Sequence, residues 1–482
     1  MSVESTSGSP EQTTLRPNAI GLPGVLFQSI TTMAPASAVA FTLGPAAIGY
    51  TGGALPLAVL IALVVCTFVA LNIGAMARHL PSAGGYFTYV SRGLGSQVGW
   101  MTGWLFDLAY LLIVPFQLLV LGPVADGFVR QYFHFTALGA NGWVFWAMVF
   151  AVIVFALTYF GIRLSTNTSV VLGVIEITVF VLLSAWLIVT AGNGNTAATF
   201  NPASSSVHGL GGWQGILQGM IFVFLAFAGF ESSAPLAEEA HNPRRTVPRA
   251  ILLATVLIGI FYVFCSYAGV VGWGFNTIGT YTQNANPWAA MATRVWGPFE
   301  FIVSLAILNS ALANANAGVN AASRVLFAMG RVKALPGRLA HVNHFRTPDI
   351  AIIFTMIVAV VCTLWPGLVY GPAVAFNLLG IIIGIPILIV YMATCLSVPF
   401  FYRREQAGEF NVLQHVILPA IPFIVLAIVL YFQFVPYPQQ APYTLVGPIC
   451  AAWFVIGILA IVLLSVRTPQ ALARGSEIYL EE

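Results

Sequence analysis

Three carboxylate side chains lie inside long apolar runs of this sequence, where an ionisable group is costly. They are Asp107, Glu176 and Glu231. A charged side chain at the centre of a membrane-spanning helix costs on the order of 2.5–3.5 kcal/mol on insertion scales, so a partner or a function is the default interpretation. A carboxyl group without hydration also favours its neutral form, which makes proton binding possible. These positions predict cation or proton chemistry within the apolar region.

Each carboxylate leaves two interpretations open. Asp107 lies three residues before Tyr110 on one helical face, and it either pairs with a cationic substrate or makes an internal polar contact. Glu176 is interpreted first as a protonatable coupling group and second as a buried neutral acid. Glu231 either takes part in substrate binding or braces the backbone around it by hydrogen bonds.

A stripe of amide and hydroxyl side chains follows further along the chain. Its members are Asn309, Asn316, Asn320 and Ser323, and their offsets of 0, 7, 11 and 14 residues place them on one face of a helix. Hydrogen bonding between helices explains such a stripe. The alternative is a sodium site between this helix and the first one, with Asn309 and Asn316 as ion-coupling residues.

The first apolar segment contains residues that interrupt a helix near its middle. Within residues 31–37, Pro35 lacks an amide N–H and disfavours helical backbone at Ala34. About 12 residues precede the interruption, which corresponds to roughly 18 Å of helix and places it near the middle of a bilayer. A simple proline kink packed against neighbouring helices is the alternative interpretation.

A second interruption is predicted within residues 227–235. Gly229 weakens the helix, Ser232 or Ser233 is a natural N-cap, and Pro235 suits the first turn of a new helix. Irregular backbone at this depth is tolerated where its freed groups line a cavity or bind a ligand. Two such interruptions, five helices apart, favour an inverted repeat with a substrate site between the broken helices.

The composition shows which elements must position these residues. Of the 482 residues, 59% are hydrophobic and 7% are charged, against about 25% in an ordinary soluble domain. Lipid tolerates such a chain, and the long unbroken apolar runs indicate helices rather than barrel strands. Windows of about 19 residues predict twelve transmembrane helices. They lie near 22–49, 53–78, 95–128, 143–161, 167–191, 213–240, 248–273, 297–330, 349–366, 371–400, 412–434 and 443–466.

The basic residues orient these helices. With a cytoplasmic N-terminus, sixteen of the eighteen Lys and Arg fall on the inner side, and only Arg130 and Arg294 fall outside. This asymmetry obeys the positive-inside rule and predicts a multi-pass protein of the plasma (inner) membrane with both termini cytoplasmic. It also accounts for the net charge of +3, so no nucleic-acid partner is expected. Residues 1–17 and 467–482 are predicted to be cytoplasmic tails, the first of them disordered.

Three motifs resemble those of amino acid permeases in the amino acid–polyamine–organocation (APC) superfamily. The first runs from Phe224 to Glu231 and continues through Glu238-Glu239, Asn242-Pro243-Arg244-Arg245 and Pro248-Arg249. The second is the stretch 81–89 after the second helix, and the third is the stretch 320–331 that closes the eighth. The resemblance covers residues 18–400. The arginines Arg244, Arg245 and Arg249 beside Glu238 and Glu239 are interpreted as an inner-surface charge network, or as ordinary solvated loop charges.

The resemblance implies a LeuT-like fold, with residues 18–191 and 213–400 as inverted five-helix repeats and residues 401–466 as helices 11 and 12. It implies that substrate binds where the first and sixth helices are broken. The binding residues that it implies are Met33, Ala34, Pro35, Ala36, Ser37, Phe227, Ala228, Gly229, Phe230 and Glu231, to which Asp107 and Tyr110 are added from the third helix. The free N–H groups of a half-helix suit a carboxylate, and unwound carbonyl groups suit an ammonium group.

One departure from the family pattern concerns the substrate. Amino acid permeases of this kind carry a Gly-Ser-Gly-like run at the first break, whereas this chain has Ala34-Pro35-Ala36-Ser37. The expected function is secondary active transport of amino acids, with proton-coupled symport favoured. A polyamine or organic amine transporter, a substrate exchanger and sodium coupling stay open as alternatives. The only lysine is Lys333 in a loop, so the coupling lysine of some relatives is missing and Glu176 is the candidate in its place.

Other function classes fit the sequence less well. No filter-like repeat indicates a channel, and the seven histidines are too scattered for a membrane enzyme. The loops are too short to hold a receptor domain. The sequence contains no Walker A motif, so ATP is not expected as the energy source. The five cysteines form no CxxC pair, so neither a metal site nor any other cofactor is expected. The oligomeric state stays open.

Overall fold

The computed structural model describes residues 21–81, 85–161, 166–207, 210–237, 240–331 and 335–467. The predicted N-terminal tail, Glu238, Glu239, Lys333 and nearly all of the predicted C-terminal tail lie outside the described residues. The same holds for Arg16, Arg163 and Arg474 among the basic residues and for part of the 81–89 motif.

Helices form nearly all of the described structure, as the long apolar runs predict. The α-helices are α1 Leu22–Thr32, α2 Pro35–Ser37, α3 Ile48–Thr51, α4 Leu55–His79, α5 Tyr86–Leu94, α6 Ser96–Phe133, α7 Gly142–Tyr159, α8 Thr166–Ala191, α9 Gly212–Phe227, α10 Pro243–Trp273, α11 Pro287–Trp296, α12 Phe301–Arg331, α13 Asp349–Tyr370, α14 Pro372–Glu405, α15 Leu418–Phe432 and α16 Val446–Arg467.

Shorter elements connect these helices. Two are π-helices, η1 Ala38–Ala47 and η12 Leu413–Ile417. The 3-10 helices are η2 Gly52–Ala54, η3 Gly139–Asn141, η4 Gly192–Gly194, η5 Ala197–Phe200, η6 Pro202–Ser204, η7 Phe230–Leu236, η8 Phe275–Gln283, η9 Gly297–Glu300, η10 Gly337–Ala340, η11 Ala407–Glu409 and η13 Tyr443–Leu445. The strands β1 Ser206–Val207 and β2 Leu210–Gly211 pair antiparallel, with Ser206 opposite Gly211.

Eleven stretches of the described residues are long and apolar enough to cross a membrane. The first, Leu22–His79, has 58 residues, whereas one crossing needs about 20. This stretch is therefore long enough for the first two predicted helices, and the chain turns at Gly52, whose φ of 53° suits glycine. The prediction of an all-helical membrane protein is confirmed. Twelve crossings stay a prediction.

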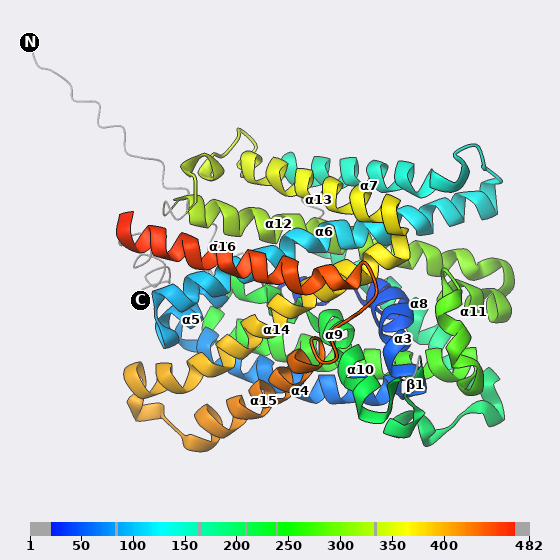
Figure 1. Cartoon of the computed structure of the whole chain (residues 1–482), viewed down its shortest axis with the longest axis horizontal. Coiled ribbons are helices and arrows are strands. Elements are labelled where there is room, and N and C mark those ends of the chain that lie inside the picture. The colour runs from blue at the N-terminus through cyan, green and yellow to red at the C-terminus, as the bar shows by residue number, and fades with distance from the viewer. Residues whose placement is uncertain are drawn as a thin grey trace, which may run out of the picture.

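The long helices run side by side along the molecule, with α7 and α13 together at one edge and α15 at the opposite edge (Figure 1). The stretches that contain α6, α9 and α14 are the most enclosed, with 94%, 83% and 78% of their apolar windows buried, against 6% for α16. On α16, Leu459 is 63% exposed and Val466 is 79% exposed. Their apolar surface suits lipid, and the enclosed helices form the centre in which polar groups can be held.

Candidate functional site

The first predicted interruption lies between α1 and α2. Helix α1 ends at Thr32, and Ala34 has a φ of 47° and a ψ of 64°, outside right-handed helical backbone. Because the backbone turns at Ala34, the Thr32 and Met33 carbonyl oxygens do not accept from the amides four residues further on and need other donors. The side-chain amide of Asn314 on α12 donates to the Thr32 carbonyl oxygen at 2.7 Å. The Met33 carbonyl oxygen lies 2.9 Å from the Tyr262 hydroxyl of α10.

The second interruption lies between α9 and η7, directly beside the first. Helix α9 ends at Phe227, and Gly229 has a φ of 113°, which favours glycine. A Cβ atom at Gly229 would lie 2.9 Å from both the carbonyl carbon and the carbonyl oxygen of Thr32. Gly229 therefore allows close approach of the two interrupted helices. It packs against α1 and does not line the cavity described below.

Serine side chains join the two interruptions. The Ser29 hydroxyl on α1 donates to the Phe230 carbonyl oxygen at 2.7 Å and accepts from the Ser233 amide at 3.2 Å. The Ser232 hydroxyl lies 2.9 Å from that of Thr32. The prediction that Ser232 or Ser233 caps a new helix is wrong, because η7 already begins at Phe230 after Gly229. The free amide of Ser233 is instead satisfied from α1.

Tyr262 contacts the backbone of both interruptions at once. Its hydroxyl oxygen lies 2.9 Å from the Met33 carbonyl oxygen and 3.0 Å from the Ala226 carbonyl oxygen near the end of α9. The side chain is fully buried, and its ring packs edge-on against Phe227. Since a phenol has one proton, the two carbonyl groups share a single donor.

Glu231 braces the second interruption. One carboxylate oxygen accepts from the Gly229 amide at 3.0 Å and from the Tyr391 hydroxyl of α14 at 3.2 Å. The other accepts from the Tyr110 hydroxyl of α6 at 3.2 Å. The carboxylate is 3% exposed and has three donors from three parts of the chain, so it ties the turn to α6 and α14. This geometry corresponds to the bracing interpretation of Glu231.

A narrow cavity of about 20 Å³, room for about one water molecule, lies between the two interruptions. Its lining residues are Met33, Ala34, Ala38, Thr42, Ile113, Phe116, Gln117, Leu225, Ala226, Ala228 and Asn314. Three of the predicted binding residues are among them: Met33, Ala34 and Ala228. The other predicted ones lie outside this lining, namely Pro35, Ala36, Ser37, Asp107, Tyr110, Phe227, Gly229, Phe230 and Glu231.

Two amide side chains of the lining are not among the binding residues predicted from the sequence. Gln117 on α6 accepts a hydrogen bond from the Ser37 hydroxyl at 3.2 Å, and its own N–H groups donate to no described residue. Asn314 is 8% exposed, and its carbonyl oxygen Oδ1 has no partner among the described residues. The sequence feature that marks both residues is a polar amide within an apolar helix. Asn314 was missed because it lies off the stripe that starts at Asn309.

Asp107 is fully buried on α6, but it does not line the cavity. Neither of its carboxylate oxygens has a hydrogen-bond partner among the described residues. Its neighbour on the helical face, Tyr110, turns its hydroxyl to Glu231 instead. The structure therefore separates Asp107 from the cavity lining and from Glu231.

Glu176 connects α8 to α12. Its carboxylate oxygens accept from the Asn309 amide at 2.8 Å and from the Ser310 hydroxyl at 3.1 Å. The rest of the predicted stripe bonds locally, since the Asn320 amide donates to the Asn316 carbonyl oxygen at 2.9 Å. The structure brings Asn309 to Glu176 and leaves Asn316 apart from them. Among the described residues, no group of three or more His, Cys, Asp or Glu side chains could hold a metal ion.

Comparisons with known proteins identify the family of this chain. The family model "Amino acid permease" matches residues 24–471. A branched-chain amino acid permease of Lactococcus lactis is 28% identical over 408 residues, which cover 80% of this chain and 83% of the relative. An L-asparagine permease of Salmonella typhimurium is 26% identical over 69% of this chain and 67% of the relative. A low-affinity putrescine importer of Escherichia coli is 27% identical over 45% of this chain and 46% of the importer.

Solved structures show the same fold at low sequence identity. A manganese transporter of Eremococcus coleocola superposes with a TM-score of 0.57 at 12% identity and covers 94% of both chains. This likeness shows a LeuT-like fold and nothing about the substrate. The curated relatives are permeases, not enzymes. Because the family model matches most of the sequence, this membrane protein belongs to the amino acid permease family.

Proposed function

We propose that the protein carries neutral, apolar amino acids across the plasma membrane together with protons. The observation that carries this proposal is the cavity shared by the two interruptions. Its described lining residues combine the side-chain amides of Gln117 and Asn314 with apolar side chains, and none of them is charged. A zwitterion needs one anion-binding and one cation-binding group, and interrupted helices supply both without charged side chains.

The proposed contacts to the substrate backbone come from the first interruption. The first N–H groups of a helix have no carbonyl partner four residues back, and at α2 these belong to Ala36 and Ser37. Both residues lie outside the cavity lining in this structure, and we propose that they meet the substrate carboxylate once the cavity widens, with support from the helix dipole. The unpartnered Oδ1 of Asn314 suits the ammonium group. The Gln117 amide, held by Ser37, adds a further donor.

The lining favours an apolar substrate over a diamine. Met33, Ile113, Phe116 and Leu225 surround the cavity with apolar surface. A diamine such as putrescine carries two positive charges, and none of the described lining residues has a carboxylate to pair with them. The branched-chain permease among the relatives points the same way. The cavity must widen to hold an amino acid, which is the movement that alternating access supplies.

Proton coupling is proposed to run through Glu176. The residue is hydrogen-bonded to Ser310 of α12, and Asn314 lies one helical turn further along, where it holds the Thr32 carbonyl group. A change in the charge of Glu176 therefore acts on the helix that supports the first interruption. Sodium binding near Asn309 and Asn316 is the competing proposal.

We also propose the topology that this mechanism requires. Residues 18–191 and 213–400 are proposed as inverted repeats, because the first helix of each contains one of the two interruptions. Residues 401–466 add two further helices. Both termini are proposed to lie in the cytoplasm, on the side of the basic loops.

Ligand-dependent unfolding of the purified protein tests the substrate. A ligand at one hundred times its Kd stabilises a protein by about 2.7 kcal/mol, so apolar amino acids should raise the unfolding temperature and putrescine should not. Gln117→Leu should weaken amino acid binding about tenfold through loss of one donor. At the same ligand concentration the stabilisation should then fall to about 1.4 kcal/mol. Gln433→Leu is the matched control, because that amide donates only to backbone at α9 and α15. Equal stabilisation by putrescine would contradict the proposal.

A further inference from the structure

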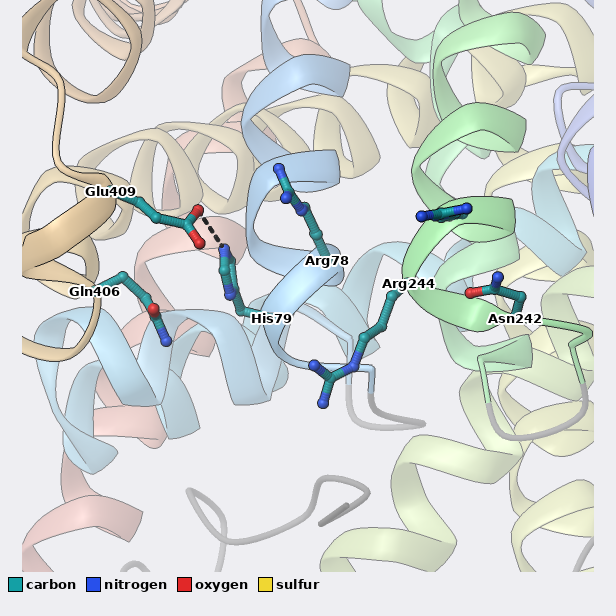
Figure 2. Close-up of a pocket in the computed structure, with 7 residues that line it drawn as sticks. Arg78, His79, Asn242, Arg244, Gln406 and Glu409 are labelled. Carbon is teal, nitrogen blue, oxygen red and sulfur yellow. Dashed lines mark ion pairs between the residues drawn. The ribbon is translucent and has the colours of Figure 1, made fainter.

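A second and larger pocket, of about 590 Å³, opens at the end of the molecule where α4 stops and α10 starts. Its lining residues are Arg78, His79, Asn242, Arg244, Arg245, Gln406 and Glu409. Figure 2 shows Gln406 and Glu409 on one side, Asn242 on the other, and Arg78, His79 and Arg244 between them. Three separate segments thus meet around one opening.

The charge of this pocket is strongly uneven. Among the described lining residues there are three arginines, and Glu409 is the one acidic side chain. That carboxylate is engaged with His79, whose Nε2 lies 3.3 Å from it. Neither the Arg78 nor the Arg245 guanidinium group makes a hydrogen bond or an ion pair within the described part of the chain. Like charges held in one concave site repel each other and raise the local positive potential, so an anion lowers the energy of the arrangement.

The chemistry of these groups matches a phosphate. Guanidinium groups offer planar, paired N–H donors that fit phosphate oxygens, and they stay charged at every physiological pH. The side-chain amides of Asn242 and Gln406 can add neutral donors from opposite walls. Helices α4 and α10, which carry these arginines, approach closely one turn deeper, where a Cβ on Gly74 would lie 3.4 Å from Pro248.

We propose that this pocket, which we call the basic pocket, binds a phosphate group at the side of the membrane predicted to be cytoplasmic. The phosphate belongs either to an anionic lipid head group or to a free phosphate-bearing solute, because both present the same oxygens. A bound phosphate would join the ends of α4 and α10 to the η11 turn, across the gap that the His79–Glu409 contact now spans. The proposal is independent of the transported substrate.

Binding can be measured by thermal unfolding of the whole protein in two arms. One arm adds inorganic phosphate to protein in detergent, and the other compares nanodiscs of phosphatidylcholine with nanodiscs that contain phosphatidylglycerol. Stabilisation by phosphate in detergent identifies a free solute as a ligand, and stabilisation by phosphatidylglycerol alone identifies a lipid head group. Absence of stabilisation in both arms overturns the proposal.

Variants assign the effect to the basic pocket. The double variant Arg78→Gln/Arg245→Gln should weaken binding at least about tenfold, since each arginine supplies a charge-assisted hydrogen bond. The control Arg403→Gln/Arg404→Gln removes the same charge from exposed positions outside the lining and should bind like the parent protein. Glu409→Gln should strengthen binding, because it removes the acidic side chain of the lining. Equal binding by parent, double variant and Glu409→Gln overturns the proposal.

Discussion

Replacement of Glu176 by Gln tests proton coupling with little change in shape. In the parent protein the carboxylate accepts from Asn309 and from Ser310. The Gln side chain keeps one acceptor for Asn309, and its amide can donate to the Ser310 hydroxyl, which also accepts. At most one hydrogen bond is exchanged, so the free energy of unfolding should change by about 1 kcal/mol or less. The variant loses the ability of residue 176 to bind and release a proton.

The expected result is loss of accumulation without loss of transport. One pH unit across the membrane corresponds to about 1.4 kcal/mol per proton, enough for up to about tenfold accumulation of substrate at one proton per substrate. In proteoliposomes without a membrane potential and with an acidic outside, Glu176→Gln should bring the ratio of inner to outer substrate down to about one. Exchange of labelled for unlabelled substrate should continue, because it needs no net proton movement.

Two further variants separate coupling from structure. Glu176→Leu leaves the Asn309 and Ser310 donors without an acceptor, at about 1–3 kcal/mol each, and should lower the unfolding temperature where Gln does not. Glu300→Gln changes another buried carboxylate, at the end of η9, which accepts from Ser304 of α12 and from Gln131 and Tyr132 of α6. This control should keep full accumulation. Normal accumulation by Glu176→Gln, or destabilisation as large as that of Leu, would refute the reasoning. Uptake that needs sodium and ignores the pH gradient would show that the coupling ion is wrong.

Three other outcomes are expected. Gly229→Ala should abolish uptake and lower the unfolding temperature, because the positive φ costs an L-residue about 1–2 kcal/mol and the new Cβ would lie 2.9 Å from Thr32. Gly127→Ala is the control and should be neutral, since its Cβ would meet nothing within 4 Å. Asp107→Asn should leave uptake and unfolding temperature unchanged, because no described group donates a hydrogen bond to the Asp107 carboxylate. Reduced uptake would indicate that Asp107 binds the substrate. Reporter fusions at the C-terminus and within the loop 192–212 should lie on opposite sides of the membrane, and a result on the same side would contradict twelve crossings.

The helices could be predicted because their length and apolarity are properties of the chain itself. The eighth predicted segment, 297–330, corresponds to α12 Phe301–Arg331, since lipid demands a run of this length. The positions of both interruptions also followed from local chemistry. Pro35 removes an amide and Gly229 permits a positive φ, and both effects depend on single residues rather than on packing.

The partners of polar side chains could not be predicted in the same way. Asn314 faces the Thr32 carbonyl group, and Asn316, two residues further on, does not; which of them faces inward depends on how α12 rotates against α1. The cap at Ser233 comes from Ser29, more than two hundred residues away in sequence, so no local motif reveals it. Glu231 was placed correctly at the interruption, but its three donors depend on the packing of α6 and α14.

The shared donor at Tyr262 gives the two sides of the interruptions unequal resistance to opening. Its single proton serves either the Met33 or the Ala226 carbonyl oxygen, so one hydrogen bond survives whichever chain moves away. On the other side, separation of α1 from η7 breaks the Ser29–Phe230, Ser233–Ser29 and Ser232–Thr32 hydrogen bonds together, at about 1 kcal/mol each. We therefore expect the broken helices to swing about Tyr262 as a hinge, while the Ser29 contact acts as the latch that must release first.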